Sequence, residues 1–156
     1  WSRSFIGLNG DFAKERVNGG DFFKTTYDKP HYLNLVTNYK FTRRYSLSLN
    51  LVYSSGRPVT YPIGKWQFNT AESLQYSERN AFRIPDYFRV DLGFDIEGSH
   101  KIKKLAHSFW TFSIYNLFGR DNAYSIFFKT VGGDVEGYKM TVFANPIPTI
   151  TFNFKI

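Results

Sequence analysis

Apolar and polar side chains alternate along most of the chain, and an alternation with period two is typical of β-strands with one apolar face. Leu47, Leu49 and Leu51, for example, alternate with Ser48 and Asn50. No segment repeats its apolar residues at the 3.6-residue period of an amphipathic helix. The pattern therefore predicts an all-β protein with antiparallel strands. Six strands are expected, at residues 1–5, 31–41, 45–60, 86–97, 108–130 and 138–156.

This alternation fits both a soluble β-sandwich and a transmembrane β-barrel, because each has one apolar and one polar face. Three features favour the barrel. The polar positions carry mostly Ser, Thr and Asn, which suit a crowded aqueous lumen. The strands predicted at 45–60 and 108–130 exceed the average of about five to six residues, and a tilted transmembrane strand needs about 9–11. Tyrosine and tryptophan, which prefer the membrane–water boundary, lie near the ends of the apolar runs, at Tyr32, Tyr39, Tyr45, Tyr53, Tyr87 and Trp110.

The links between the predicted strands also alternate in length. The links at 42–44 and 98–106 are short, the link at 61–85 is long, and another long loop ends at Pro30. Bacterial outer-membrane barrels have short periplasmic turns and longer exterior loops. Six strands are fewer than the minimum of about eight in such barrels, and an open sheet would leave two unpaired edges in lipid. We therefore expect the chain to be the last part of a larger barrel.

The composition excludes several other classes. Aromatic residues make up 20% of the chain, which argues against disorder, and no apolar run approaches the roughly 18 residues of a membrane-spanning helix. The absence of Cys excludes disulfides, thiolate metal sites and a cysteine nucleophile. The net charge of +7 arises largely from links between strands rather than from an aromatic platform, so no nucleic-acid partner is expected. The chain opens at Trp1 without an initiator Met or a signal-peptide pattern, which suggests a mature or truncated polypeptide.

Five segments occur together in one order along residues 27–156. They are YDKPH at 27–31, VYSSGRPVT at 52–60, RNAFRIPDYFRVDL at 79–92, YNLFGRDN at 115–122 and IPTITFNFKI at 147–156. In this combination and order, the chain resembles the C-terminal end of TonB-dependent outer-membrane receptors, particularly the nutrient-uptake branch that includes SusC-like proteins. One position departs from the family, which usually ends in an aromatic residue where this chain has Ile156.

The resemblance implies that residues 1–156 form about the last six strands of a 22-stranded transmembrane barrel in the bacterial outer membrane. The earlier strands and the N-terminal plug would lie outside this sequence. The implied function is binding of a nutrient (glycan, peptide or metal chelate) at the cell surface, followed by import energised by the TonB complex. The implied partners are outer-membrane lipid, the plug and, in some receptors of this branch, a SusD-like surface lipoprotein.

The polar positions of three predicted strands supply candidate lumen-facing residues. Arg89, Asp91 and Asp95 share one face of the strand at 86–97. They are expected either to line the solute path or contact the plug, or to form an ion-pair network in the barrel wall. Asn116 interrupts the alternation after Ile114 and is interpreted as a bulge or a structural hydrogen-bonding position. The complete set of lumen-facing candidates is Asn34, Asn38, Lys40, Ser48, Asn50, Arg89, Asp91 and Asp95.

The long loops supply candidate ligand contacts. Trp66 and Phe68 lie in the link at 61–85, and Phe22 and Phe23 lie in the first loop. Exposed aromatic rings stack on sugars or hydrophobic ligands. The alternative is that these rings pack loop against loop or against missing parts of the barrel.

No pattern in the sequence indicates an enzyme or a cofactor. The three His residues lack metal-ligand spacing, and the chain contains no Gly-x-Ser-x-Gly nucleophile motif. We therefore expect a non-catalytic protein without a cofactor. The competing hypothesis from another class is a soluble or surface-exposed β-sandwich that acts as a binding module. In a sandwich, the apolar face of each sheet would be covered by a second layer.

Overall fold

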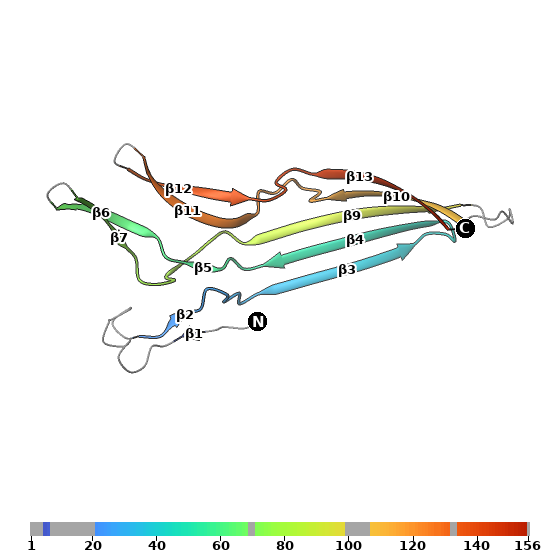
Figure 1. Cartoon of the computed structure of the whole chain (residues 1–156). Helices are drawn as coiled ribbons and strands as arrows, with labels where there is room; N and C mark the ends of the chain where they lie inside the picture. The colour runs from blue at the N-terminus through green and yellow to red at the C-terminus, as the bar shows by residue number, and fades with distance from the viewer. Residues whose placement is uncertain (1–4, 7–20, 69–70, 99–106, 132–133, 156) are drawn as a thin grey trace. The chain divides into compact units, whose positions relative to one another are not determined.

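The computed structural model describes residues 5–6, 21–68, 71–98, 107–131 and 134–155 (Figure 1). The regular elements in this part of the chain are β-strands paired in antiparallel sheets, which confirms the predicted all-β class. No helix among these residues is long and apolar enough to cross a membrane. The chain divides into two compact units. Unit 1 comprises Trp1–Tyr32, Ser54–Tyr87 and Ala123–Thr141, and unit 2 comprises Leu33–Tyr53, Phe88–Asn122 and Val142–Ile156.

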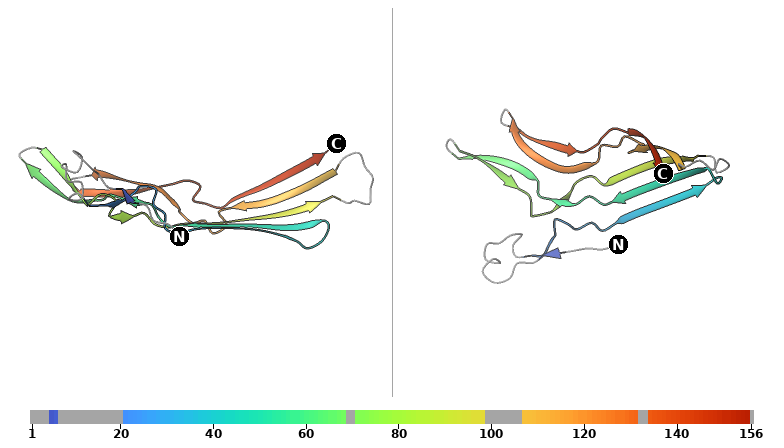
Figure 2. Two further views of the ribbon diagram at one scale, coloured as in Figure 1. Left: turned by 90° about the horizontal axis from the view of Figure 1, so that it is seen from below. Right: turned by 45° about the vertical axis from the view of Figure 1, so that its right-hand side comes forward.

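Unit 2 is built on one five-stranded antiparallel sheet. Its strands are β3 (Tyr32–Lys40), β4 (Tyr45–Ser54), β9 (Tyr87–Glu97), β10 (His107–Tyr115) and β13 (Ile147–Lys155), in the spatial order β13-β10-β9-β4-β3. The five strands form a single layer (Figures 1 and 2). β3 and β13 are the edges of this sheet, and within the described part of the chain each pairs with one neighbour only.

Backbone hydrogen bonds fix the register of this sheet. Phe41 N donates to Tyr45 O over 3.0 Å at the β3–β4 turn, and Glu97 N donates to Arg44 O over 2.7 Å between β9 and β4. Trp110 of β10 lies opposite Ile96 of β9 and Phe152 of β13. Because the strands are antiparallel, the chain leaves the sheet after β4 and after β10 at the same end, and the short β3–β4 turn lies at the other end.

The two faces of the sheet differ sharply in polarity. One face carries the apolar member of each alternating pair, including Leu35, Tyr39 and Phe112. These side chains are not covered, since Leu35 is 49% and Tyr39 60% exposed. Trp110 contacts Phe152 across the strands, with ring centroids 4.6 Å apart, yet both rings stay largely exposed. No described residue of unit 2 forms a second layer over this apolar face.

Unit 1 consists of four short strand pairs and the segments that join them. The pairs are β1 (Phe5–Ile6) with β2 (Phe23–Lys24), β5 (Pro58–Val59) with β8 (Phe82–Arg83), β6 (Pro62–Phe68) with β7 (Ala71–Tyr76), and β11 (Ala123–Val131) with β12 (Asp134–Thr141). Tyr61 joins two of them, because its ring stacks on Phe82 at 5.0 Å and meets Phe128 edge-on at 5.1 Å.

Two predicted strands match the structure closely, and three others are wrong in extent. The strand at 31–41 is confirmed as β3 and the strand at 86–97 as β9. The strand predicted at 45–60 ends at Ser54. The strand predicted at 108–130 stops at Tyr115, because Asn116 takes a left-handed backbone with φ of 53°. The strand predicted at 138–156 is likewise divided between β12 and β13. Residues 1–4 of the first predicted strand lie outside the described residues.

The prediction that residues 61–85 form a long link without strands is also wrong. This segment contains the β6–β7 hairpin, in which Trp66 lies opposite Ser73. The register of this hairpin shifts between Pro62 and Gly64, which places a bulge at the start of β6. The predicted short link at 98–106 falls mostly on residues 99–106, and these lie outside the described residues. The expected barrel closure is not formed by the described strands, because no sheet among them closes on itself.

Candidate functional site

The eight candidate lumen-facing residues lie on one face of the unit 2 sheet. The pairing of β4 with β9 sets Ser46 opposite Asp95 and Asn50 opposite Asp91. The β3–β4 turn, closed by Phe41 and Tyr45, sets Asn38 opposite Ser48. Period-two alternation then brings the remaining candidates to the same face, which is opposite the apolar one. The full set is Asn34, Asn38, Lys40, Ser48, Asn50, Arg89, Asp91 and Asp95.

Asp91 is the centre of a polar cluster on this face. Its Oδ2 accepts hydrogen bonds from Arg89 Nε at 3.0 Å and from Asn50 Nδ2 at 3.1 Å. Its Oδ1 accepts the backbone N–H of Asn116 at 3.0 Å. Arg89 also donates to the Tyr115 hydroxyl at 2.7 Å. The side chains of Arg89 and Asp91 are 21% and 20% exposed, so the pair is only partly open to water. This arrangement agrees with the ion-pair interpretation of Arg89 and Asp91.

Asp95 has a different environment from Asp91. Its Oδ1 accepts the Thr111 hydroxyl at 2.6 Å, and its Oδ2 lies 3.4 Å from Ser46 Oγ. Neither of these groups carries a positive charge. Among the described residues, the carboxylate is therefore held by neutral hydroxyl donors, and the two interpretations of Asp95 stay predictions.

Small side chains cross the sheet between these two carboxylates. Gly93 lies beside Ser48 on one neighbouring strand and opposite Ser113 on the other. A Cβ at position 93 would lie 2.3 Å from Ser48 Oγ, so only glycine fits without movement of its neighbour. Ser113 continues the row to Thr149, with their hydroxyl oxygens 2.7 Å apart. The polar face therefore combines small hydroxyl groups with two anchored carboxylates.

Asn116 confirms the expectation of a structural hydrogen-bonding position. It is 2% exposed, and its Nδ2 lies within hydrogen-bonding distance of three carbonyl oxygens, at Arg120 (3.2 Å), Phe143 (3.1 Å) and Ala144 (2.9 Å). These bonds hold the chain where it leaves β10 next to the segment that leads into β13. Asn122 has a related role, because its side chain exchanges two hydrogen bonds of 2.9 Å with the backbone of Phe88. The sequence pattern gave no signal for Asn122.

The candidate ligand contacts of the long loops divide into exposed and buried rings. Trp66 is 56% exposed on β6, and Phe22 is 76% exposed just before β2. Phe23 is only 8% exposed, so it is not an exposed ligand contact and instead agrees with the alternative that these rings pack within the protein. It packs within unit 1 because Arg79 lies over its ring, with the guanidinium carbon 5.4 Å from the ring centroid. Phe68 ends β6, and its side chain lies outside the described residues.

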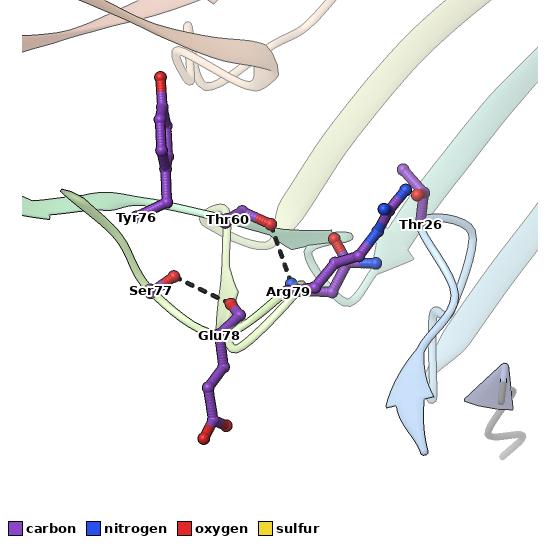
Figure 3. Close-up of a pocket in the computed structure, with 7 residues that line it drawn as sticks. Thr26, Thr60, Tyr76, Ser77, Glu78 and Arg79 are labelled. Carbon is purple, nitrogen blue, oxygen red and sulfur yellow. Dashed lines mark hydrogen bonds between the residues drawn. The ribbon is translucent and has the colours of Figure 1, made fainter. Parts of the chain in front are cut away.

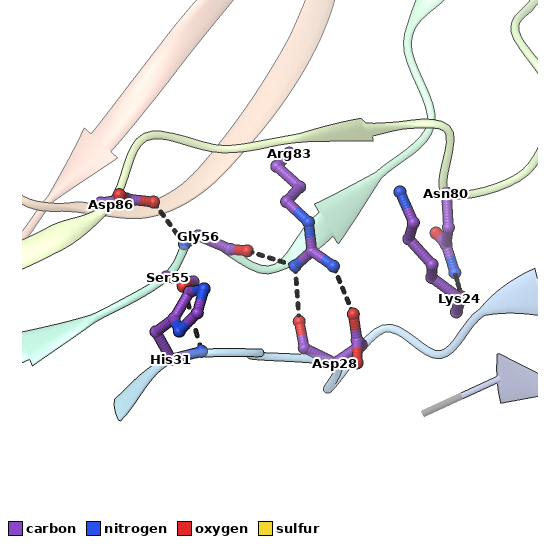
Figure 4. Close-up of polar contacts among 8 residues, drawn as sticks. All are labelled: Lys24, Asp28, His31, Ser55, Gly56, Asn80, Arg83 and Asp86. Atoms are coloured by element: carbon purple, nitrogen blue, oxygen red, sulfur yellow. Dashed lines mark hydrogen bonds and ion pairs between the residues drawn. The ribbon is translucent and has the colours of Figure 1, made fainter. Parts of the chain in front are cut away.

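A buried ion pair fastens the segments of unit 1 together (Figure 4). Asp28 is 2% exposed, and its carboxylate pairs with the Arg83 guanidinium. Arg83 Nη1 also donates to the backbone carbonyls of Asp28 and Gly56, each at 2.8 Å. Gly56 N in turn donates to Asp86 Oδ1 at 2.9 Å. This Asp28–Arg83 clasp therefore links the segment before β3, the segment after β4 and strand β8.

The described residues contain no group of three or more His, Cys, Asp or Glu side chains arranged to hold a metal ion. The chain matches no protein-family model, no curated protein and no solved structure.

Proposed function

We propose that this chain is the C-terminal part of a TonB-dependent receptor barrel in a bacterial outer membrane. The receptor binds a nutrient at the cell surface and imports it in a TonB-dependent manner. In this proposal, the five strands of unit 2 cross the membrane, and unit 1 belongs to the exterior connections. The choice of this family rests on the five segments that resemble such receptors, at 27–31, 52–60, 79–92, 115–122 and 147–156.

The single observation that carries the membrane part of the proposal is the uncovered apolar face of unit 2. Contiguous exposed apolar patches on soluble monomers rarely exceed a few hundred Å². Here the face extends over five strands and includes Leu35, Phe112 and Phe152, which are 49%, 40% and 49% exposed. Hydrocarbon covers such a face without a second protein layer. The strands have 9, 10, 11, 9 and 9 residues in chain order, which matches the length of about 9–11 residues that a tilted transmembrane strand needs.

The lengths of the connections between the strands also support the barrel proposal, with the long connections on the exterior side. Residues 55–86 and 116–146 leave the sheet at one end, and the turn at 41–44 lies at the other. Short periplasmic turns and long exterior loops are typical of outer-membrane barrels. Tyr39 and Tyr45, at the end of the apolar face that carries the short turn, have the amphipathic rings that settle at a membrane boundary.

The edges of the sheet make further strands necessary in this proposal. β3 and β13 each present one row of backbone N–H and C=O groups without a strand partner among the described residues. In hydrocarbon, each unpaired backbone group costs several kcal/mol, so a membrane sheet closes into a barrel. Bacterial barrels of a single chain have at least about eight strands. Earlier strands of the same barrel would pair with both edges, and the polar face with Asp91 and Asp95 would then line the lumen and meet solute or plug.

Paired cysteine substitutions test which face contacts lipid. The 156 residues contain no Cys, so a thiol introduced at Leu49 or Ser48, or at Phe112 or Ser113, is the only one in this part of the native polypeptide. In outer membranes from cells that make the native polypeptide, we expect a lipid-phase thiol reagent to label Leu49→Cys and Phe112→Cys. A charged maleimide should instead label Ser48→Cys and Ser113→Cys. The reverse pattern, or recovery of the native polypeptide in the soluble fraction, would support the β-sandwich module and overturn the membrane proposal.

The import part has a separate test. Cells that lack this polypeptide should lose uptake of a nutrient that the parent strain accumulates, and cells that lack TonB should lose uptake of the same nutrient. Uptake that persists without TonB would contradict the transport mechanism while leaving the membrane assignment intact.

A further inference from the structure

A polar hollow of unit 1 does not define a binding site. It is lined by Thr26, Thr60 and residues 76–80, around the turn that precedes β8. Figure 3 shows that the side chains of Tyr76, Glu78 and Arg79 point in different directions. They therefore offer no single position at which one ligand contacts all of them.

A different hollow lies in unit 2, at the end of the sheet that carries the β3–β4 turn. It has a volume of about 450 Å³. Three of its lining residues have cationic side chains, and one, Glu97, has a carboxylate. The lining consists of Lys40, Thr42, Arg43, Arg44, Tyr45, Ser46 and Glu97.

Hydrogen bonds fix the turn that presents these cations. Thr42 Oγ1 accepts the backbone N–H groups of Arg44 and Tyr45, each at 3.2 Å. Arg44 O accepts the N–H of Glu97 at 2.7 Å, so the turn is bonded to β9 as well. The backbone positions of Arg43 and Arg44 are therefore set before any ligand binds.

The Arg44 side chain is held in place by two contacts. Its Nε donates to Glu97 O at 3.1 Å, and its Cζ lies 5.9 Å from the centroid of the Tyr45 ring. Within the described part of the chain, these contacts leave its two Nη groups without an acceptor. A guanidinium held in this way loses little further entropy on binding, and its remaining N–H groups match the oxygens of a phosphate.

Lys40 and Arg43 add positive charge beside Arg44. Both side chains are exposed, and neither forms an ion pair with a carboxylate of the described residues. Three cations gathered at one hollow repel one another, and the single carboxylate of Glu97 balances at most one of them. An anion bound in the hollow would therefore be stabilised by all three.

The hollow borders the uncovered apolar face of the sheet. Tyr45 belongs to both, because it lines the hollow and its ring stacks on Phe94 of the apolar face, with centroids 6.1 Å apart. Tyr39 and Phe41 lie next to the same turn, meet edge-on at 4.9 Å and are 60% and 55% exposed. A molecule bound here can place an anionic group among the cations and an apolar chain along the rings. A phospholipid has both parts.

We propose that this hollow binds the phosphate group of a membrane phospholipid whose acyl chains lie on the apolar face. Arg44 is the fixed anchor, and Lys40 and Arg43 supply further charge. The lipid belongs to the leaflet on the side of the short turn. Basic clusters next to membrane-spanning segments attract anionic lipids, so phosphatidylglycerol should bind more tightly than phosphatidylcholine. The inference rests on the membrane part of the proposed function and adds to it a specific lipid site.

Acetylation of Lys40 tests this site on the purified native polypeptide in vesicles. An acetylating reagent modifies accessible lysines, and peptide mass spectrometry measures the rate at each one. The vesicles contain phosphatidylcholine alone, phosphatidylcholine with added inorganic phosphate, or phosphatidylcholine mixed with phosphatidylglycerol. We expect phosphatidylglycerol to slow the acetylation of Lys40 several-fold and inorganic phosphate to leave it unchanged. Lys129, which is exposed on β11 in unit 1, should react at the same rate in every sample.

Variants of the two arginines locate the effect at the hollow. In Arg43→Gln and Arg44→Gln, the acetylation of Lys40 with phosphatidylglycerol should return toward its rate in phosphatidylcholine, and more completely in Arg44→Gln. Arg44→Lys keeps the charge but loses the planar donors, so its rate should fall between those of the parent and Arg44→Gln. Lys129→Gln is the matched control and should behave as the parent.

Other outcomes would overturn the proposal. Protection of Lys40 that persists in both glutamine variants would come from the general charge of the vesicle surface. Equal protection by inorganic phosphate would identify a free anion as the ligand. Flotation of the vesicles separates this proposal from the proposed function. A polypeptide that does not enter the vesicles would contradict the membrane assignment and the lipid site together, whereas a polypeptide that enters without protection of Lys40 would contradict only the lipid site.

Discussion

Asp91 Oδ1 accepts the backbone N–H of Asn116, with 3.0 Å between oxygen and nitrogen. This bond joins the middle of β9 to the point where the chain turns out of β10. The second oxygen of the same carboxylate binds Arg89 and Asn50. One partly buried side chain thus connects three neighbouring strands. Its hydrogen bonds are stronger than those between neutral groups, because the acceptor is charged.

The first prediction concerns the charge of Asp91. Asp91→Asn keeps the shape of the side chain but removes the charge that balances Arg89 and one of the acceptor oxygens. We expect the free energy of unfolding to fall by about 1.5–3 kcal/mol, the usual value of hydrogen bonds to charged groups. Denaturant titration followed by tryptophan fluorescence measures this change. The control is Asp134→Asn, because Asp134 is 92% exposed and lies 4.0 Å from Lys65, and such surface pairs contribute about 0–1 kcal/mol. Equal effects of the two variants would contradict the role assigned to Asp91.

The second prediction separates the two contributions of Asn116. Asn116→Gly accepts the left-handed backbone but loses the side-chain bonds to Phe143 and Ala144. Asn116→Ala loses the same bonds and also strains the backbone, which costs about 1 kcal/mol more. We therefore expect stability in the order parent, Asn116→Gly, Asn116→Ala, measured by the same titration. A glycine variant as stable as the parent would show that only the conformation matters at this position.

Local alternation predicted the sheet of unit 2 well where each strand is continuous. In β3 and β9, every second side chain faces the apolar side, so the period alone places Leu35 and Phe94. The ends of β4 and β10 were missed because they depend on single residues with special roles, such as the left-handed Asn116. Apolar and polar residues can continue to alternate in the sequence beyond the residue where the strand ends.

The Asp28–Arg83 clasp could not be predicted from the sequence. The two residues are separated by 55 positions, and no periodicity relates a loop residue to a two-residue strand such as β8. The β6–β7 hairpin is not predicted from the sequence either, because β7 (Ala71–Tyr76) contains few apolar residues. The sequence leaves open whether the Phe23 ring is exposed or packed, because an aromatic residue in a loop gives no sign of the arginine that covers it. The exposed ring of Phe22 agrees with its predicted loop position, whereas Trp66 is exposed on strand β6.

The third prediction tests the Asp28–Arg83 clasp. Removing one member of a buried pair leaves an uncompensated charge and costs about 3–5 kcal/mol. Asp28→Asn should therefore unfold unit 1 locally, which hydrogen exchange at the amides of Gly56 and Ile84 would detect as faster exchange. Arg83→Met should have a similar effect, and the double variant should lose less than the sum of the two single variants, because it leaves no unpaired charge. Strict additivity would mean that the two side chains act independently.

The fourth prediction compares two glycines of unit 1. A Cβ at position 56 would lie 1.7 Å from the backbone oxygen of Ile84, which no side-chain movement relieves. Gly56→Ala should therefore cost more than about 3 kcal/mol or prevent unit 1 from folding. At Gly64, the nearest atom to an added Cβ is Gln75 Oε1 at 3.6 Å, an ordinary contact. Gly64→Ala should stay within about 0.5 kcal/mol of the parent. Thermal unfolding of both variants measures the difference, and a tolerated alanine at 56 would contradict the close approach of the two segments.

The last prediction concerns pH and the exposed hairpin of β11 and β12. The Tyr138 hydroxyl donates to Glu136 Oε2 at 2.6 Å. This hydrogen bond, followed by the negative charge of Glu136 and then burial, raises the pKa of Tyr138 above its ordinary value of 10.0. Because the protonated phenol is the favoured form, any stability from this pair is present at neutral pH and is lost as the pH rises through the raised pKa.

Glu136→Gln removes the charge and should lower the pKa of Tyr138 toward 10.0, which NMR of ring-labelled tyrosine measures residue by residue. Asp134→Asn removes a carboxylate from the same hairpin without touching this hydrogen bond, so it serves as the control. The two variants separate the specific contact from the general charge of the hairpin. If Asp134→Asn lowered the Tyr138 pKa as much as Glu136→Gln, the shift would come from the surrounding field, and the hydrogen bond would not be its cause.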